Sequence, residues 1–306
     1  MITLRSGCKI NLGLTVTGRR ADGYHELDSL FIPLPLPADT LALRPLDSDT
    51  CRVACTRAGI DPACNTLTKA YAAFRSLGGI LRHGLDIRLT KRVPSGAGLG
   101  GGSANAAALL RWLNAHAATP LTREALLAAA LNVGADVPFF LYGTPCRVQG
   151  IGEKITPCAP DLAGLRLVLV CPDVAVSTAW AYARYDALRD AATNRKKTLT
   201  IAEKNNYRKH LIGRDEKHSV AAAVPSLYNS LEEPVFAAFP QLGDIKRHLE
   251  AAGAHAAMSG SGSSVFGIFG ADCPEETVSA CVANLRRQWA RVFTLSLPSR
   301  WDVAKW

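Results

Sequence analysis

Five glycines stand within seven residues between Gly96 and Gly102, in the stretch VPSGAGLGGGSANAAALL that begins at Val93. A backbone without Cβ atoms can adopt positive φ and can turn its N–H groups toward a ligand. An alanine-rich helix is predicted directly after the glycines, with Ser103 as its N-cap, so an anion in the loop would also face the positive end of that helix. This combination indicates a loop that binds the phosphates of a nucleotide.

Three known phosphate loops can be compared with this stretch. Gly96, Gly98 and Gly101 fit the GxGxxG pattern of dinucleotide sites, but the acid expected about twenty positions later would be Glu124, which lies at the start of a predicted helix and not at a strand end. Gly96 and Gly101 also have the spacing of a Walker A loop, but Gly102 takes the place of its lysine. The sequence contains none of the VAIK, HRD and DFG motifs of protein kinases.

A flexible glycine linker is the remaining alternative for this stretch. Linkers do not usually carry an apolar residue such as Leu99 in mid-run, nor a capped amphipathic helix directly after the glycines. The phosphate loop is therefore the better interpretation. Because it works mainly through backbone N–H groups, it must obtain its charged groups from other segments of the chain.

The strand predicted over residues 8–16 can supply a cation. Its apolar residues alternate with polar ones, so that Lys9 and Asn11 share one face of the strand. A glycine-containing turn over residues 18–23 follows and leads to His25. Taken alone, Lys9 is an ordinary strand lysine and His25 an ordinary turn residue. Only a shared site would give them a role in catalysis or binding.

Asp136 can supply an acid–base group. It follows Gly134, which can end the preceding helix, and it stands where the N-cap of the next helix would be. Capping is the ordinary role of an aspartate at such a place. The alternative is that Asp136 accepts a proton from a hydroxyl group of a substrate, because it comes just after two helices that start from the phosphate loop. The spacing leaves both roles open.

The elements that must position these residues form two groups. The length of 306 residues predicts two domains, and the pattern restarts after Pro157, so we expect domains over residues 1–157 and 158–306 of an α+β protein. The expected strands cover residues 8–16, 27–34, 40–46, 51–56, 85–89, 165–171, 254–258, 265–269 and 291–297. The expected helices cover residues 65–77, a run from Ser103, a run after a Thr122 cap, and residues 177–188, 241–252 and 273–289. A second glycine-rich turn, SGSGSS at residues 259–264, is by itself a hairpin turn.

The composition argues against a membrane or secreted protein. No apolar run approaches the eighteen or so residues that span a bilayer, and the first residues lack the apolar region and cleavage site of a signal peptide. The nine cysteines are an odd number and are scattered, which suits a reducing compartment better than a disulfide framework. We therefore expect a cytoplasmic protein with no membrane partner.

The formal net charge of +9 requires a nucleic-acid partner to be considered. Much of this charge lies in residues 194–218, where eight Lys or Arg face three acids, and we interpret the stretch as a solvated insertion; an anion-binding flap is the alternative. A nucleic-acid binder needs aromatic residues interleaved with basic ones, and this stretch has a single one, Tyr207. A basic surface also attracts a small polyphosphate substrate, so we expect no nucleic-acid partner.

Several motifs together resemble those of the GHMP small-molecule kinases. PSGAGLGGGSAN is similar to their second motif, and MSGSGSSVFGIF is similar to their third. KINLGLTVTGRRADGYHELDSLF, supported by GADVPFF and GIGEK, is similar to the first motif of one branch. That branch phosphorylates the 2-hydroxyl of a cytidine diphosphate derivative of methylerythritol in the non-mevalonate isoprenoid pathway. A kinase for a sugar, homoserine or mevalonate would lack the GRRADGYH segment.

The resemblance implies a fold and a site. The N-terminal domain would be related to ribosomal protein S5 domain 2, the C-terminal domain would be ferredoxin-like, and the active site would lie in the cleft between them. Lys9 and Asp136 would be catalytic, and Asn65 and Lys91 would lie near the adenine of ATP. The ATP phosphates would be bound by Pro94, Ser95, Gly96, Ala97, Gly98, Leu99, Gly100, Gly101, Gly102, Ser103 and Ala104. The substrate would be bound by Asn11, Tyr24, His25, Asp136, Thr178 and Tyr182.

The resemblance also implies that ATP is used with Mg²⁺, with no side chain assigned to the metal, and that the enzyme is a monomer or weak homodimer. Tyr24 and Tyr182 would stack on the two faces of cytosine. One segment departs from the family pattern. Where the family usually has an Asn-Asp pair followed by an acid, this chain has Asn229-Ser230-Leu231-Glu232.

Overall fold

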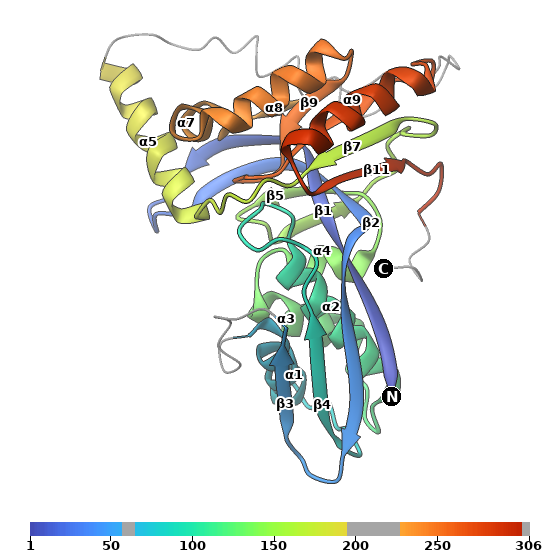
Figure 1. Ribbon diagram of the computed structural model, residues 1–306. Coiled ribbons are helices and arrows are strands. Elements are labelled where there is room, and N and C mark those ends of the chain that lie inside the picture. Colours follow the sequence, from blue (N-terminus) through green and yellow to red (C-terminus); the bar gives the residue numbers. More distant parts are fainter. Residues whose placement is uncertain (57–64, 195–226, 302–306) are drawn as a thin grey trace, which may run out of the picture.

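The computed structural model of the protein describes residues 1–56, 65–194 and 227–301. Figure 1 shows two lobes, and one hairpin of two long strands runs through both of them. The hairpin consists of β1 (Ile2–Arg19) and β2 (His25–Leu46), which pair antiparallel from Ile2 with Leu43 to Arg19 with His25. The two strands predicted over residues 27–34 and 40–46 are thus parts of one strand.

The proline-rich segment between the two predicted strands stays extended. Pro35 and Pro37 have no N–H to donate to a ladder, and the register shifts between Ser6 and Cys8 of β1, opposite this segment. The irregularity accommodates the prolines without ending the strand. As a result β2 is part of both lobes, and Asp39 lies in β2 directly after the irregular segment.

The N-terminal sheet has the strand order β3-β4-β2-β1-β8, where β8 is Tyr228–Asn229. β5 also pairs with β2, and β6 pairs with β5. Four helices cover one face of it, and their apolar side chains form a core with those of β2 and β4. The short strands are β3 (Cys51–Cys55), β4 (Gly84–Thr90), β5 (Cys146–Gly150) and β6 (Lys154–Pro157). The helices are α1 (Thr66–Ser76), α2 (Gly101–His116), α3 (Arg123–Val133) and α4 (Val137–Tyr142).

The C-terminal sheet is antiparallel and has the strand order β11-β7-β10-β9. Its strands are β7 (Arg166–Val170), β9 (His255–Met258), β10 (Val265–Phe269) and β11 (Val292–Ser296). The helices of this half are α5 (Thr178–Asn194), α7 (Glu232–Ala238), α8 (Pro240–Ala251) and α9 (Glu275–Gln288). Within this sheet the order along the chain is strand, helices, two strands, helix and strand, with the first and third strands in the middle. This is the ferredoxin-like arrangement that the resemblance implied, with extra helices before β9.

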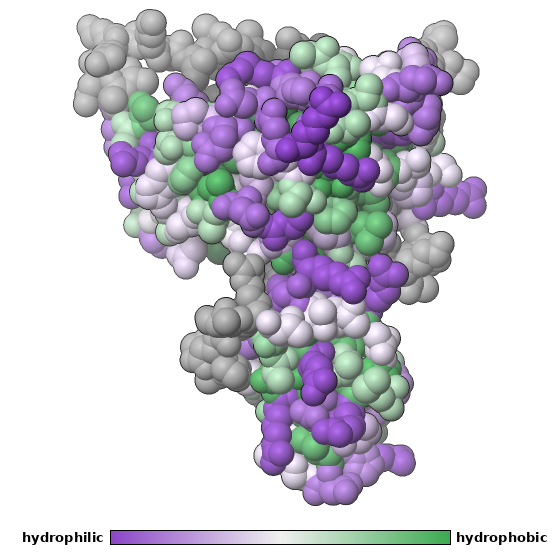
Figure 2. Space-filling view, in the orientation of Figure 1, coloured by the Kyte–Doolittle hydropathy of each residue, from purple (hydrophilic) through white to green (hydrophobic). Residues whose placement is uncertain are grey.

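The two lobes share a hydrophobic core. Cys8, Ile10 and Leu12 of β1 pack with side chains of β7 and β10, including Leu167 and Phe266. The face of β1 that carries these residues therefore looks into the joint core, and Lys9 and Asn11 lie on the opposite face. Figure 2 shows hydrophilic side chains over much of the outer surface around α8 and α9, which lie on the far side of the upper lobe from the hairpin.

One strand crosses between the two halves of the sequence. β8 (Tyr228–Asn229) comes from the C-terminal half but pairs in parallel with β1, at Gly13 and Leu14. The domain division at residue 157 falls at the end of β6 and stays a prediction. No helix in the described parts of the chain is both long and apolar enough to cross a membrane. The predicted basic insertion over residues 194–218 lies, except for its first residue, outside the described residues.

Candidate active site

The glycine-rich loop over residues 94–104 is anchored by alternate side chains. Ala97 and Leu99 are buried in the joint core, whereas Ser95 and Gly96 are exposed and Gly98 is half-buried. The interpretation as a flexible linker is therefore wrong for this segment, because Leu99 holds the middle of the loop in place. Alternation of this kind leaves the backbone accessible while its shape stays fixed.

Four consecutive carbonyl groups of the loop are bound by neighbouring segments of the protein. The carbonyls of residues 96, 97, 98 and 99 accept hydrogen bonds from Val176 N, Ser264 N, Ser259 Oγ and Lys9 N, at 3.1, 3.2, 3.0 and 2.9 Å. In the described parts of the chain, no hydrogen bond uses the N–H groups of Gly98, Leu99 or Gly100 as donor. Glycines with φ of 66°, 73° and 66° at positions 96, 98 and 100 produce this arrangement. The loop thus presents free N–H groups to an anion, which fits ATP phosphates.

The helix after the loop begins earlier than predicted. α2 starts at Gly101 with Gly100 as its N-cap in the left-handed conformation, so the prediction of Ser103 as N-cap is wrong. Gly101 and Gly102 are part of the first turn of α2. At position 101 a larger side chain would clash with Val93. A Cβ on Gly101 would lie 2.7 Å from Cγ1 of Val93. The positive end of the helix therefore begins directly at the last loop glycine.

Lys9 lies against this loop. It is only 4% exposed, its Nζ donates to Asn11 Oδ1 at 2.6 Å, and the same atom lies 4.7 Å from the centre of the Phe31 ring. Burial lowers the pKa of Lys9, and the nearby Asp136 carboxylate is the main effect that opposes this. The ammonium and the carboxylate are therefore close enough to interact electrostatically, although they are far apart in the sequence.

Asp136 stands at the N-cap position of α4, but its side chain makes no capping hydrogen bond. Its backbone angles, φ −82° and ψ −10°, are helical and not the extended ones usual for an N-cap, so capping does not account for the carboxylate. Asp136 is half-buried and influences both Lys9 and Tyr182, whose pKa is raised by burial first and by the charge of Asp136 second. The charge of Asp136 thus acts on Lys9, beside the loop, and on Tyr182, in the aromatic group.

The residues expected to bind the substrate form a second group around His25. The His25 ring stacks on Tyr182 at a centroid distance of 4.6 Å, and its Nε2 lies 2.7 Å from Asp186 Oδ1. Thr178 Oγ1 lies 2.9 Å from Ser261 Oγ, which ties the start of α5 to the second glycine-rich loop. Tyr24 is 62% exposed, and in the described structure it is the imidazole of His25, not Tyr24, that stacks on Tyr182.

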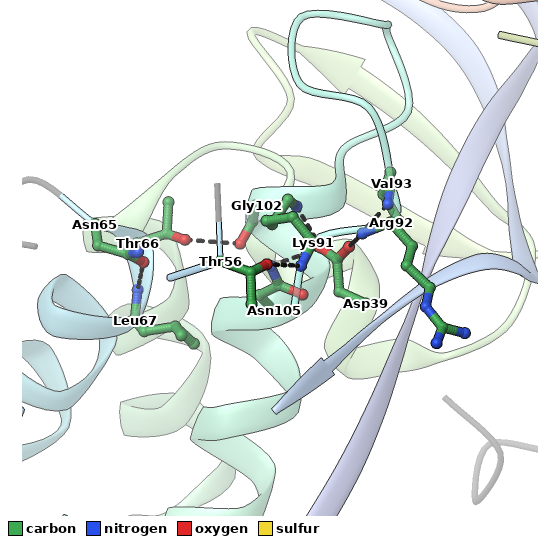
Figure 3. Close-up of polar contacts among 10 residues, drawn as sticks. All are labelled: Asp39, Thr56, Asn65, Thr66, Leu67, Lys91, Arg92, Val93, Gly102 and Asn105. Carbon is green, nitrogen blue, oxygen red and sulfur yellow. Dashed lines mark hydrogen bonds and ion pairs between the residues drawn. The ribbon is translucent and has the colours of Figure 1, made fainter. Parts of the chain in front are cut away.

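The two residues expected near the adenine already have partners (Figure 3). Asn65 is the N-cap of α1, and its side chain accepts a hydrogen bond from Leu67 N at 2.9 Å. The Lys91 ammonium forms an ion pair with the buried Asp39. Thr66 Oγ1 donates to the carbonyl of Gly102 at 2.9 Å and so connects α1 to the start of α2.

The second glycine-rich loop, residues 259–264, packs against the first. It does connect the hairpin strands β9 and β10, as expected, but all six of its residues are buried. A Cβ on Gly98 would lie 1.9 Å from the carbonyl oxygen of Ser259, so the two loops touch through their backbones. The second loop also contacts Lys9, because a Cβ on Gly260 would lie 3.2 Å from Lys9 Nζ. The second loop therefore forms one wall of the site.

Sequence reasoning missed four polar residues that support this site. Asp39 holds the segment that enters the first loop, and Ser29 Oγ accepts a hydrogen bond from Asn11 Nδ2 at 2.9 Å. Asn229 Nδ2 donates to the carbonyls of Met258 and Gly260 at 2.7 and 2.8 Å. Glu232 accepts from Met258 N at 2.8 Å. The only sequence signal was polarity within apolar strands for Asp39 and Ser29; the segment with Asn229 and Glu232 was noticed only as a departure from a family pattern.

The described residues contain no group of three or more His, Cys, Asp or Glu side chains that could hold a metal ion.

Comparisons with known proteins agree with this geometry. Residues 65–144 match the family described as GHMP kinases N terminal domain, and residues 216–291 match the family described as GHMP kinases C terminal. The fold and the site thus define a small-molecule kinase of the GHMP class. Over 296 residues the chain is 46% identical to 4-diphosphocytidyl-2-C-methyl-D-erythritol kinase of Nitratidesulfovibrio vulgaris strain Hildenborough, which covers 95% of this chain and 97% of the relative. The chain belongs to the family of 4-diphosphocytidyl-2-C-methyl-D-erythritol kinases.

Further relatives support the same family. The kinase of that name from Oleidesulfovibrio alaskensis is 43% identical, over 87% of this chain and 90% of the relative. A crystal structure of 4-(cytidine 5'-diphospho)-2C-methyl-D-erythritol kinase matches with a TM-score of 0.71 and 32% identity, over 96% of this chain and 98% of the other. Homoserine kinase from Cytophaga hutchinsonii matches with a TM-score of 0.66 at 19% identity, over 97% and 96%, which shows a shared fold.

Proposed function

We propose that the protein transfers the γ-phosphoryl group of ATP to the 2-hydroxyl group of 4-diphosphocytidyl-2-C-methyl-D-erythritol. The family membership supports the reaction. The observation that carries the proposal is the position of Lys9: its backbone N–H bonds the phosphate loop at Leu99, and its ammonium lies in the field of the Asp136 carboxylate. One residue thus connects the anion-binding backbone to the group that can take a proton.

Each part of the site has a role in this proposal. The free N–H groups of the loop over residues 94–104 and the start of α2 bind the phosphates of ATP. Asp136 accepts the proton of the substrate hydroxyl as its oxygen bonds to phosphorus. Lys9 keeps the carboxylate ionised and offsets the negative charge that develops on the transferring phosphoryl group. Such a transfer needs alignment and charge stabilisation more than covalent help from the protein.

The cytidine part of the substrate is assigned to the group around His25. Because the rings of His25 and Tyr182 are in contact, both can reach one base. Stacking on Tyr182 and on the exposed Tyr24 provides a surface for the pyrimidine, and hydrogen bonds from His25 read its edge. Asn11 and Thr178 complete the substrate side, while Asn65 and Lys91 mark the adenine side near the start of α1.

The proposal also includes Mg²⁺ as the partner of ATP, because the charge of the triphosphate has to be offset during transfer. A cytoplasmic location and a monomeric or weakly dimeric state stay predictions.

The first experiment changes Asp136→Asn. We expect kcat for phosphoryl transfer to fall by at least about 100-fold, since the base is lost, while the affinity for a non-hydrolysable ATP analogue stays within about twofold, because the loop amides are unchanged. Asp272→Asn is the control, since Asp272 is exposed and lies beyond β10, just before α9. Turnover by the Asp136 variant at the rate of the unaltered protein would remove this residue as the base.

The second experiment compares two acceptors, the full substrate and methylerythritol 4-phosphate without its cytidine part. We expect phosphorylation of the full substrate only, because the group around His25 has no ligand in the shorter acceptor. Equal rates on both would reject the assignment of that group to cytidine.

A further inference from the structure

Asp39 is a buried carboxylate to which the catalytic scheme assigns no role. It lies in β2, is 0% exposed, and receives four hydrogen bonds (Figure 3). Oδ1 accepts from the backbone N–H groups of Arg92 and Val93 at 2.7 and 2.8 Å. Oδ2 accepts from Asn105 Nδ2 at 2.9 Å and from the Lys91 ammonium. Both oxygens of the carboxylate are therefore fully used.

The four donors lie at the two ends of the phosphate loop. Lys91, Arg92 and Val93 lead into the loop over residues 94–104, and Asn105 follows it within α2. The separation in sequence between Asp39 and these donors is 52 to 66 residues. One carboxylate thus holds the incoming and the outgoing end of the loop at a fixed distance from each other.

Two details connect this cluster to the part of the loop that binds an anion. A Cβ on Gly101 would lie 3.4 Å from Lys91 Nζ and 2.9 Å from Cβ of Val93, so the cluster contacts the first residue of α2. Asn105 Oδ1 is buried and has no hydrogen-bond partner within the described part of the chain. The orientation of the Asn105 amide is therefore set by Asp39 alone, at the cost of an unsatisfied oxygen.

We propose that Asp39 is a positioning residue for nucleotide binding: its carboxylate fixes the distance between the two ends of the phosphate loop and so the spacing of the loop N–H groups that bind phosphate. The inference rests on the proposed function for the identity of the ligand. It predicts that the loss of the carboxylate weakens ATP binding and leaves binding of the cytidine substrate nearly unchanged, because that substrate lies on the other side of Asp136.

The test is the variant Asp39→Asn, which keeps the shape but replaces one oxygen by a donor that faces Lys91 and Asn105. We expect the KM for ATP and the Kd for a non-hydrolysable ATP analogue to rise by at least about tenfold, the scale of one lost charge-assisted hydrogen bond. The KM for the cytidine substrate should change by less than about twofold. A rise in both constants by the same factor, or in neither, would overturn the proposal.

The matched control is Asp28→Asn. Asp28 is a buried acid on the same strand, and its two oxygens accept from Arg147 at 2.9 and 2.6 Å, away from the loop. This change should lower the thermal midpoint to a similar degree without the selective effect on ATP. If it raises the KM for ATP as much as Asp39→Asn does, the effect is one of general stability and the proposal fails.

A rescue variant keeps the proposal testable where Asp39→Asn does not fold. The double exchange Asp39→Asn with Asn105→Asp leaves one carboxylate and one amide in the cluster, with the carboxylate next to Lys91. We expect it to bind the ATP analogue more tightly than the single variant Asn105→Asp, because coupled neighbours compensate each other. Binding no tighter than that of Asn105→Asp would contradict the proposal. Failure of the unaltered protein to phosphorylate the cytidine substrate would refute the proposed function, whereas the nucleotide Kd still tests Asp39.

Discussion

The two glycine-rich loops of the protein have similar compositions and opposite environments. In the loop over residues 94–104, Ser95 and Gly96 are exposed, and the N–H groups of Gly98, Leu99 and Gly100 donate no hydrogen bond within the described parts of the chain. In the loop over residues 259–264, every residue is buried and the serine side chains of residues 259, 261 and 263 bond neighbouring segments. The first loop uses glycine to present its backbone to a ligand. The second uses glycine to let another backbone come close.

The two glycine-rich loops therefore work as one unit. The second loop is the support against which the first is held, since Ser259 Oγ and Ser264 N bind two of its carbonyls. Lys9 lies between the two loops, in contact with the positions of Gly100 and Gly260. A change in the buried loop should therefore affect catalysis although no residue of that loop is assigned to the phosphates.

The largest effect is expected for Gly98→Ala, which breaks the contact between the loops. The added Cβ would lie 1.9 Å from the Ser259 carbonyl oxygen, and Gly98 has a φ of 73° that other residues rarely adopt. The loop must shift by about 1 Å or more, and we expect kcat/KM to fall by at least about 100-fold. Steady-state kinetics with ATP and the cytidine substrate measure this.

Gly96→Ala is the control for that change. Gly96 has a similar φ of 66°, but the nearest atom to its Cβ would be Ala175 Cβ at 3.3 Å, with Ala175 Cα and Val176 N at 3.6 and 3.8 Å. Both variants therefore have the backbone strain, but only Gly98→Ala has the clash with Ser259. We expect a loss of less than about tenfold, the kinetic equivalent of roughly 1 kcal/mol of strain. Equal losses in the two variants would show that the contact between the loops has no special role.

A smaller effect is expected for Asn229→Ala, which removes the brace of the buried loop. The change leaves the carbonyls of Met258 and Gly260 and the N–H of Leu231 without their partner. We expect the free energy of unfolding to fall by about 2–4 kcal/mol and kcat/KM to fall by about tenfold, because loop movement is transmitted to Gly98. Chemical denaturation and kinetics on the same preparation measure both quantities.

Asn114→Ala is the control that distinguishes a general loss of stability from an effect transmitted through the loops. Asn114 braces Leu121 in the same way, with its side chain bound to both the N–H and the carbonyl, but it lies at the far end of α2. This variant should lose stability and keep its kcat/KM at temperatures where it is folded. If it loses activity to the same degree, the effect of Asn229 is not transmitted through the loops.

Much of the fold could be predicted because it follows from periodicity. A helix was expected over residues 65–77, and α1 buries Leu67, Ala70, Tyr71 and Phe74, which recur at helical spacing. Boundaries were less predictable, since the prolines between residues 34 and 38 suggested a break that an irregular pairing avoids. The two-residue strand β8 is too short to leave a pattern, and its partner is more than two hundred residues away.

The candidate site also has a part that the sequence could predict and a part that it could not. Its glycine-rich loop carries a local pattern and could be found from the sequence. Asp39 and Ser29 could not, because a single polar residue in an apolar strand acquires its meaning only from partners that the fold brings to it. Asp39 meets Arg92 and Val93 across more than fifty residues. The pairing of His25 with Asp186 spans 161 residues and was equally hidden.

The smallest effect is expected for Ser29→Ala, which acts on Lys9 through Asn11. Ser29 Oγ accepts from Asn11 Nδ2, and this keeps Asn11 Oδ1 directed at the Lys9 ammonium. Burial already lowers the pKa of Lys9 below its ordinary value of 10.5, while Asp136 and then Cys8 oppose this. Without Ser29 the ammonium loses a fixed acceptor, so the pKa falls further. Activity needs the charged form and is lost as the pH rises through this pKa.

The measurement is the pH dependence of kcat. In the Ser29→Ala variant the decline of kcat on the basic side should begin at a pH lower by about half a unit or more, which is a loss of about threefold along that declining limb. Ser230→Ala is the matched control. Ser230 is also buried, and its Oγ accepts a hydrogen bond at 3.0 Å from the N–H of Val16, which lies on β1 like Lys9 but away from it. A purely structural role of Ser29 would lower kcat equally at all pH values. The same pH shift in both variants would mean that the strand as a whole, and not the chain of side chains from Ser29 to Lys9, sets the charge between the two loops.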